Sequence, residues 1–287
     1  MAIQDILGIL AIFFCVTNLG SMGLELNVYK TVRSLRSYRF ITLTLVWSWI
    51  IGLALAYFIT KILPLSAPHA AGLLLFGLAP TSPMLPILIR KARAYMDVSA
   101  AMMPIAVVGI VVLMPLIAPL LIPGVSVSSF ALAKQLVLTV LLPLAAGATI
   151  NIYASQVAVK LFPYVKKLAA LSTLVLFVFI IVVYGKELLN ALGKYAVTAQ
   201  VLWILIIGLF SYTFGFGMKQ AQRSALALGV CSRNGPAMFI AFTTFPVQDP
   251  NMLVMLILAG PVPMVVWLFL ARFFAFRAEK VADAAVA

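Results

Sequence analysis

An apolar stretch of the chain is interrupted at Ala79-Pro80-Thr81-Ser82-Pro83-Met84-Leu85-Pro86. A proline removes a backbone donor and clashes with the preceding helical turn, so Pro80, Pro83 and Pro86 cannot continue a regular helix. With its apolar flanks the stretch covers about residues 69–89, the length of a membrane-spanning helix. The sequence therefore predicts a spanning segment that is broken near its middle.

A second break lies in the apolar stretch 224–246, at Gly229-Val230-Cys231-Ser232-Arg233-Asn234-Gly235-Pro236. It combines an ionisable side chain, an amide and the helix-breaking pair Gly235 and Pro236. Irregular backbone at membrane depth is tolerated only where protein or a water-filled cavity satisfies its polar groups. Two such segments in corresponding places point to the binding site of a transporter. We therefore expect the breaks to cross and to frame a polar cavity.

The composition places the whole chain in a membrane. Of the 287 residues 64% are apolar and 9% charged, with a mean hydropathy of +1.17. Soluble globular chains are about 45–50% apolar and about 25% charged. The net charge of +13 does not indicate a nucleic-acid partner, because the basic residues form short clusters between apolar stretches.

Nine stretches are long and apolar enough to span a bilayer as helices, which predicts an all-α membrane protein. They cover about residues 3–24, 40–61, 69–89, 98–122, 131–153, 162–184, 196–217, 224–246 and 251–275.

The basic residues indicate an orientation. Most Lys and Arg residues fall in every second connection between the spans, within 30–39, 90–93, 160–167 and 219–223. Others lie in the tail 276–287 and, just before it, at Arg272. Short cytoplasmic loops carry such an excess. We expect the N-terminus outside and the C-terminus in the cytoplasm, across a plasma membrane or bacterial inner membrane. A cleaved signal peptide over residues 1–22 is disfavoured, because residues 1–5 hold no positive charge.

Polar residues at the breaks are the expected substrate-binding set: Thr81, Ser82, Ser232, Arg233 and Asn234. An arginine at membrane depth costs about 2.5–3.5 kcal/mol on insertion scales, so it should face a cavity or a partner. Arg233 could bind an anionic substrate, assisted by helix N-termini at the breaks. It could equally donate to backbone carbonyls freed by the other break and hold the crossing together. The two roles are not exclusive.

No enzyme or metal chemistry is indicated. Cys15 and Cys231 are too few for a zinc site or a disulfide framework, and His69 is interpreted as an ordinary helix-start residue. No paired carboxylates or nucleophile–base set lies in the apolar stretches, so we expect neither catalysis nor a cofactor. An obvious intramembrane Asp, Glu or His for proton coupling is also absent from the sequence pattern.

Several segments resemble the bile acid:sodium symporter family over nearly the whole chain. They are Gly20-Ser21-Met22-Gly23-Leu24-Glu25-Leu26, the Gly-x-x-Pro pattern of 77–80, Asp97-Val98-Ser99-Ala100-Ala101, and Leu226 to Asn234. The resemblance implies two inverted repeats, over 1–122 (spans one to four, the first helix missing) and 123–275 (spans five to nine). It also implies two discontinuous helices that cross, and a panel domain that moves against a core domain.

At the positions of the family's sodium ligands the sequence departs from the pattern. Gly229 stands where the family has a glutamate, Leu85 and Pro86 where it has a Ser-Asn pair, Ala101 and Ile105 where it has hydroxyl ligands, and Ser48 where it has a glutamine. Asn234 keeps the pattern, and Arg233 replaces a glutamine. Classical two-sodium coupling is therefore not expected, although sodium binding is left open. One hypothesis is that Arg233 supplies a fixed positive charge where the cation would lie.

The function expected from these observations is secondary-active or facilitative transport of a small organic anion by alternating access. Two alternatives stay open. One is export of a toxic anion or metalloid, for which Cys231 could bind a soft solute. The other is a membrane receptor or assembly partner that keeps the fold without transport. The expected partners are the organic anion and the lipid bilayer, and a homo-oligomer is left open.

Overall fold

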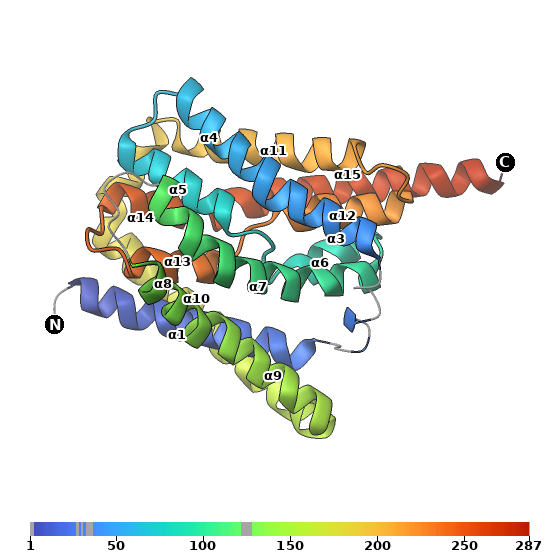
Figure 1. The fold of residues 1–287 in the computed structure, drawn as a ribbon, viewed down its shortest axis with the longest axis horizontal. Helices are drawn as coiled ribbons and strands as arrows, with labels where there is room; N and C mark the ends of the chain where they lie inside the picture. The colour runs from blue at the N-terminus through green and yellow to red at the C-terminus, as the bar shows by residue number, and fades with distance from the viewer. Residues whose placement is uncertain (1–2, 27–28, 30, 33–36, 122–127, 287) are drawn as a thin grey trace.

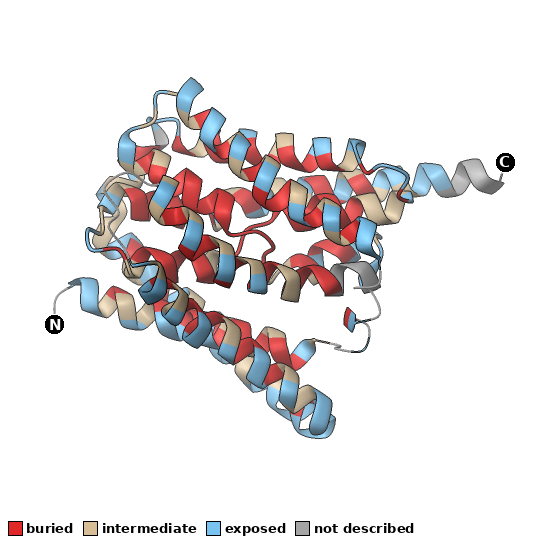
Figure 2. Cartoon of the chain, viewed as in Figure 1, coloured by how far each residue is buried: buried red, intermediate tan, exposed pale blue. Residues whose placement is uncertain are grey.

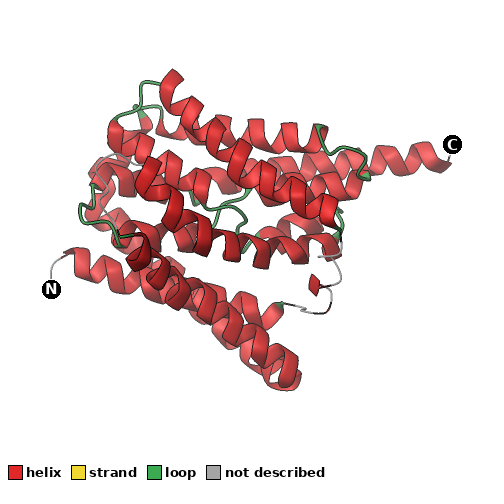
Figure 3. Ribbon diagram, in the orientation of Figure 1, coloured by secondary structure: helices red, strands yellow, loops and turns green. Residues whose placement is uncertain are grey.

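The protein is helical throughout the part described by the computed structural model, residues 3–26, 29, 31–32, 37–121 and 128–286 (Figure 1, Figure 3). Seven helices in this described part of the chain are long and apolar enough to cross a membrane. They are Ile3–Glu25, Tyr38–Ile62, Ala101–Leu121, Ser129–Tyr153, Ser155–Ala191, Ala196–Thr213 and Pro250–Val281. These helices identify an integral membrane protein.

The described helices follow one another with short connections. They are α1 (Ile3–Glu25), α3 (Tyr38–Leu45), α4 (Gly52–Ile62), α5 (Ala67–Leu78), α6 (Leu85–Lys91), α7 (Met96–Leu121), α8 (Ser129–Leu136), α9 (Leu142–Tyr153), α10 (Ser155–Leu192), α11 (Ala196–Thr213), α12 (Gln220–Cys231), α13 (Gly235–Thr243), α14 (Pro250–Leu258) and α15 (Pro261–Val286). Two π-helical turns, Val46–Ile51 and Val137–Leu141, join α3 to α4 and α8 to α9.

The two stretches that were expected to be broken are each a pair of short helices. The stretch 69–89 forms α5 and α6, and the stretch 224–246 forms α12 and α13. The predicted tail 276–287 does not begin a new segment, because α15 continues through it to Val286. Lys30, Arg33 and Arg36, together with the predicted repeat boundary at 122–123, lie outside the described residues.

The helices form two groups in Figure 1. We call α1, α8, α9 and α10 the small layer, and the remaining helices the large bundle. Within the small layer α1 and α9 cross at glycines: a Cβ on Gly147 would lie 2.5 Å from the Gly20 carbonyl oxygen and 2.8 Å from the Leu24 amide nitrogen. Small residues let two membrane helices approach at backbone contact in this way.

Burial is concentrated in the large bundle, and the breaks lie at its centre (Figure 2, Figure 3). Large apolar side chains are exposed on the periphery; Val182 on α10, for example, is 78% exposed. An exposed apolar surface of this extent suits lipid and would be costly in water.

Basic residues gather at one end of the molecule, on the right of Figure 1, where α6 and α15 end and α12 begins. Arg90 and Lys91 close α6, and Lys219 precedes α12. Arg93 just after α6 forms an ion pair with Glu279 on α15, with 2.8 Å between Nη1 and Oε1. We call this end of the molecule the basic end.

Candidate functional site

The two broken segments meet at their unwound residues. Pro80 and Arg233 form an isolated antiparallel bridge. The Thr81 amide donates to the Ser232 carbonyl at 2.8 Å, and the Asn234 amide donates to the Ala79 carbonyl at 2.7 Å. Each break therefore satisfies part of the backbone of the other.

This pairing leaves two helix carbonyls without their ordinary partners. In an unbroken helix, the carbonyl of Gly77 would accept from the amide of Thr81, and that of Val230 from Asn234. Both amides are engaged in the bridge instead. The Arg233 guanidinium takes their place: Nη1 donates to the Gly77 carbonyl at 3.1 Å, and Nη2 donates to the Val230 carbonyl. One side chain thus closes the open helix end on each side of the crossing.

Aromatic rings enclose the rest of the guanidinium. Its Cζ lies 3.9 Å from the Trp203 ring centroid and 5.7 Å from that of Phe76. Trp203 is itself held by a 2.8 Å hydrogen bond from its Nε1 to the Gly52 carbonyl. Arg233 is 1% exposed, its Nε has no hydrogen-bond partner, and no carboxylate pairs with it among the described residues. A positive charge is therefore fixed at the crossing without an acidic counterpart.

The other predicted polar residues mostly serve the backbone. The hydroxyls of Thr81 and Ser232 donate to the Gly229 carbonyl, at 3.2 and 3.1 Å. The Asn234 side chain caps α13, accepting from the Ala237 amide at 3.1 Å. Ser82 differs, because its hydroxyl accepts from the Met84 amide at 3.2 Å and donates to no other described residue. Of this set, Ser82 and Arg233 line a cavity.

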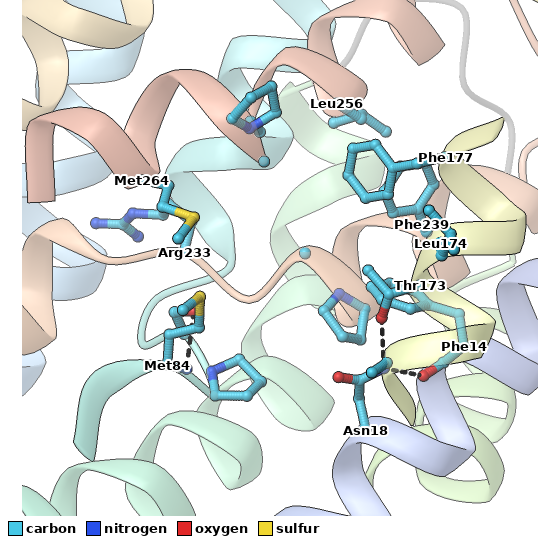
Figure 4. Close-up of a pocket in the computed structure, with 18 of the residues that line it drawn as sticks. Phe14, Asn18, Met84, Thr173, Leu174, Phe177, Arg233, Phe239, Leu256 and Met264 are labelled. Carbon is cyan, nitrogen blue, oxygen red and sulfur yellow. Dashed lines mark hydrogen bonds between the residues drawn. The ribbon is translucent and has the colours of Figure 1, made fainter. Parts of the chain in front are cut away.

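Two adjoining cavities lie between the small layer and the large bundle. The first, of about 590 Å³, is walled mainly by apolar side chains such as Phe14, Phe177, Phe239 and Leu256 (Figure 4), and we call it the apolar cavity. The second, of about 650 Å³, includes the charged side chains of Glu25, Arg90 and Lys166, and we call it the charged cavity.

Both cavities share a set of lining residues, which we call the junction. The junction consists of Asn18, Pro83, Met84, Ala170 and Thr173. Because Asn18 is on α1 and Ala170 and Thr173 are on α10, the small layer supplies one wall. The break between α5 and α6 supplies the other wall through Pro83 and Met84.

The break residues take different places around these cavities. Pro80 lies in the bridge, Pro83 at the junction and Pro86 in the charged cavity, whereas Gly235 and Pro236 line the apolar cavity. In Figure 4 the Arg233 guanidinium points away from Phe14, Asn18 and Phe239 on the far side of the apolar cavity. Its charge thus lies beside the cavity while its donors serve the two carbonyls.

Asn18 and Thr173 on the small layer are not among the residues expected from the sequence to bind the substrate. A signal was present, because polar side chains inside an apolar stretch usually face a cavity or a neighbouring helix. Asn18 and Thr173 are, however, 155 positions apart, and their hydrogen bond depends on how α1 packs on α10.

Most positions that the resemblance matches to the family's sodium ligands, among them Leu85, Ala101, Ile105 and Gly229, have no side-chain oxygen. A Cβ on Gly229 would overlap Sδ and Cε of Met102 and would lie 3.6 Å from Leu85 Cδ2. Leu85 and Ala101 are buried and Ile105 is half-buried. Ser48 contributes one buried hydroxyl, which has no hydrogen-bond partner. Among the described residues, no group of three or more His, Cys, Asp and Glu could hold a metal ion.

Comparison with known families gives a match over most of the chain. The model of the sodium bile acid symporter family matches residues 11–192. This segment includes most of the small layer, the first break and the junction. The second break, with Arg233 and Asn234, lies beyond the matched segment.

One curated relative is similar over a comparable length. It is the Arabidopsis thaliana protein named probable sodium/metabolite cotransporter BASS1, chloroplastic. The two sequences are 29% identical over 182 residues, which is 62% of this chain and 45% of the relative. The chain thus spans less than half the length of that relative.

Proposed function

Because the chain belongs to the sodium bile acid symporter family, we propose that it carries a small organic anion across a membrane by alternating access, in a secondary-active or facilitative manner. The observation that carries this proposal is the pair of joined cavities between the small layer and the large bundle, beside a crossing of two broken helices. If the small layer moved relative to the large bundle, a solute at the junction would become accessible first from one side of the membrane and then from the other.

The proposed architecture has nine spans. The pairs α5–α6 and α12–α13 each cross the bilayer as one discontinuous span, in addition to the seven long helical segments of the described residues. The spans form two inverted repeats, 1–122 and 123–275, with the small layer as panel and the large bundle as core. The antiparallel bridge between the breaks supports this, because a two-fold axis in the membrane plane relates segments that run in opposite directions.

We infer that the basic end faces the cytoplasm, which leaves the N-terminus outside. Lys91, Lys219 and Arg277 belong to that end, and an excess of basic residues marks cytoplasmic connections.

Charge favours an anionic solute. Arg233 holds a positive charge beside the apolar cavity in a medium of low polarity, where its potential is weakly screened. In the charged cavity Arg90 and Lys166 outnumber Glu25. A solute that moves from the apolar cavity to the basic end would therefore meet positive potential along the way.

Sodium is not part of the proposed mechanism. The names of the family and of the relative favour sodium coupling, but hard cations are bound through several oxygen ligands. Here Met102 occupies the space beside Gly229, and Ser48 is the single side-chain hydroxyl at the aligned positions. Uptake into proteoliposomes should therefore be the same in sodium and in potassium media; strong stimulation by sodium would overturn this part of the proposal.

Transport itself is tested by closing the junction. Ala170 on α10 is exposed and lines both cavities, so Ala170→Phe places a ring in open space between them. We expect folded protein that takes up no organic anion. The matched control is Leu171→Phe, at a neighbouring side chain that is 55% exposed and lines neither cavity. Uptake that survives Ala170→Phe would reject the pathway.

The alternatives are separated by the same assay. A receptor that kept the fold would bind anions without any flux into the vesicles. Metalloid export through Cys231 has little support from the geometry, because Cys231 is buried, donates to the Leu228 carbonyl and lines neither cavity.

A further inference from the structure

The junction holds a polar pair whose hydrogen-bonding capacity is incompletely used. Asn18 on α1 and Thr173 on α10 line both cavities and are joined by a 3.3 Å hydrogen bond from Nδ2 to Oγ1 (Figure 4). Nδ2 also donates to the Phe14 carbonyl at 2.9 Å. Neither residue has a role in the crossing of the broken helices, so their polar groups call for a separate explanation.

Chemistry fixes which way the Asn18 amide faces. The Phe14 carbonyl can only accept, so the group directed at it must be the NH₂, and both of its hydrogens are then engaged. Oδ1 accepts no hydrogen bond from another described residue, and in Figure 4 it points away from Phe14 and Thr173. The Thr173 hydroxyl donates to the Ala169 carbonyl at 2.6 Å. This wall therefore offers an acceptor and no free donor.

The large bundle, on the other side of the cavity, offers a hydrogen-bond donor. Ser82, beside the bridge, lines the apolar cavity, and its hydroxyl hydrogen has no acceptor among the described residues. An anionic oxygen of a solute could accept from it, close to the positive charge of Arg233. The remaining walls of the apolar cavity are almost entirely apolar side chains.

We propose that Asn18 is a specificity-determining residue, which selects organic anions that carry a hydroxyl or N–H donor in addition to their anionic group. The inference rests on the proposed transport function and adds the class of solute. A solute without this donor would cover Oδ1 and leave it without water and without a partner, which disfavours its binding.

The test uses pairs of anions that differ by one hydroxyl: 2-hydroxy-3-methylbutanoate with 3-methylbutanoate, mandelate with phenylacetate, and cholate with deoxycholate. Competing uptake into proteoliposomes measures the preference. For at least one pair we expect the hydroxylated anion to be preferred by about tenfold, the effect of one hydrogen bond. Asn18→Leu should remove this preference, so that the two anions of each pair are taken up in about equal proportion.

The matched control is Asn151→Leu. Asn151 on α9 also donates its amide to a backbone carbonyl, that of Leu26 at 2.9 Å, but it lines neither cavity. It should keep the wild-type preference. Uptake without preference for a hydroxyl, or a preference that persists in Asn18→Leu, would overturn this inference and leave transport standing. Absence of flux for all six anions would instead reject both the transport function and this selectivity.

Discussion

Arg233 supplies two donors at a place where two helices have each lost one. Its Nη1 and Nη2 serve the Gly77 and Val230 carbonyls, whose amide partners are drawn into the bridge. A guanidinium can do this because its donors form a rigid fork, whereas an ammonium is a single point on a flexible stem. The sequence left this backbone role and a substrate-binding role open together, because no local pattern states which way a side chain turns.

The backbone role predicts a loss of stability. Arg233→Ala leaves two buried carbonyls unpaired, at about 1–3 kcal/mol each, partly offset because a charge is no longer buried. We expect a net loss of about 2 kcal/mol, measured as a lower unfolding temperature of the purified protein. Arg233→Lys should recover part of the loss. If Arg233→Ala unfolds at the wild-type temperature but transports nothing, the guanidinium serves the solute instead.

At the scale of elements, the helices and both breaks followed from local signals in the sequence. Apolar runs of spanning length predicted the long helices, and prolines with Ser-Arg-Asn-Gly-Pro predicted the two interruptions. The lengths of the helices were harder to predict from the sequence. Helix α10 has 38 residues, and α14 and α15 divide the last predicted span at Ala259 and Gly260. The small-layer wall was not predicted, because it depends on contact between distant helices.

The crossing of α1 and α9 gives a prediction for packing. Gly147 lies at backbone contact with Gly20 and Leu24, so Gly147→Leu must force the helices apart. Overpacking a core lowers the folding stability by about 1–3 kcal/mol. We expect a loss at the upper end of this range, because the atoms that face Gly147 belong to the backbone and cannot move aside. The expected result is a low yield of folded protein in size-exclusion chromatography. Gly8→Leu on α1 meets nothing within 4 Å and should behave as wild type.

At the scale of the whole molecule, the two cavities follow one another toward the basic end. The charged cavity contains Glu25 and Arg90, which lie at the basic end where α1 and α6 finish. The apolar cavity extends from the junction past Phe177 on α10 and Leu256 on α14. In the proposed mechanism, a rigid crossing held by Arg233 would let the large bundle move as one body against the small layer, and the junction would become accessible from each side of the membrane in turn.

Alternating access then predicts opposite changes in exposure at the junction. Cys15 and Cys231 are buried and free, so replacing both with Ala and introducing Ala170→Cys gives one reporter at a residue shared by the two cavities. A membrane-impermeant thiol reagent is applied to one side of sealed vesicles at a time. Because one arrangement of the helices opens as the other closes, the transported anion should speed labelling from one side and slow it from the other. Labelling that changes in the same direction from both sides would mean that the junction loosens as a whole, and Leu171→Cys in the same background should show no dependence on the anion.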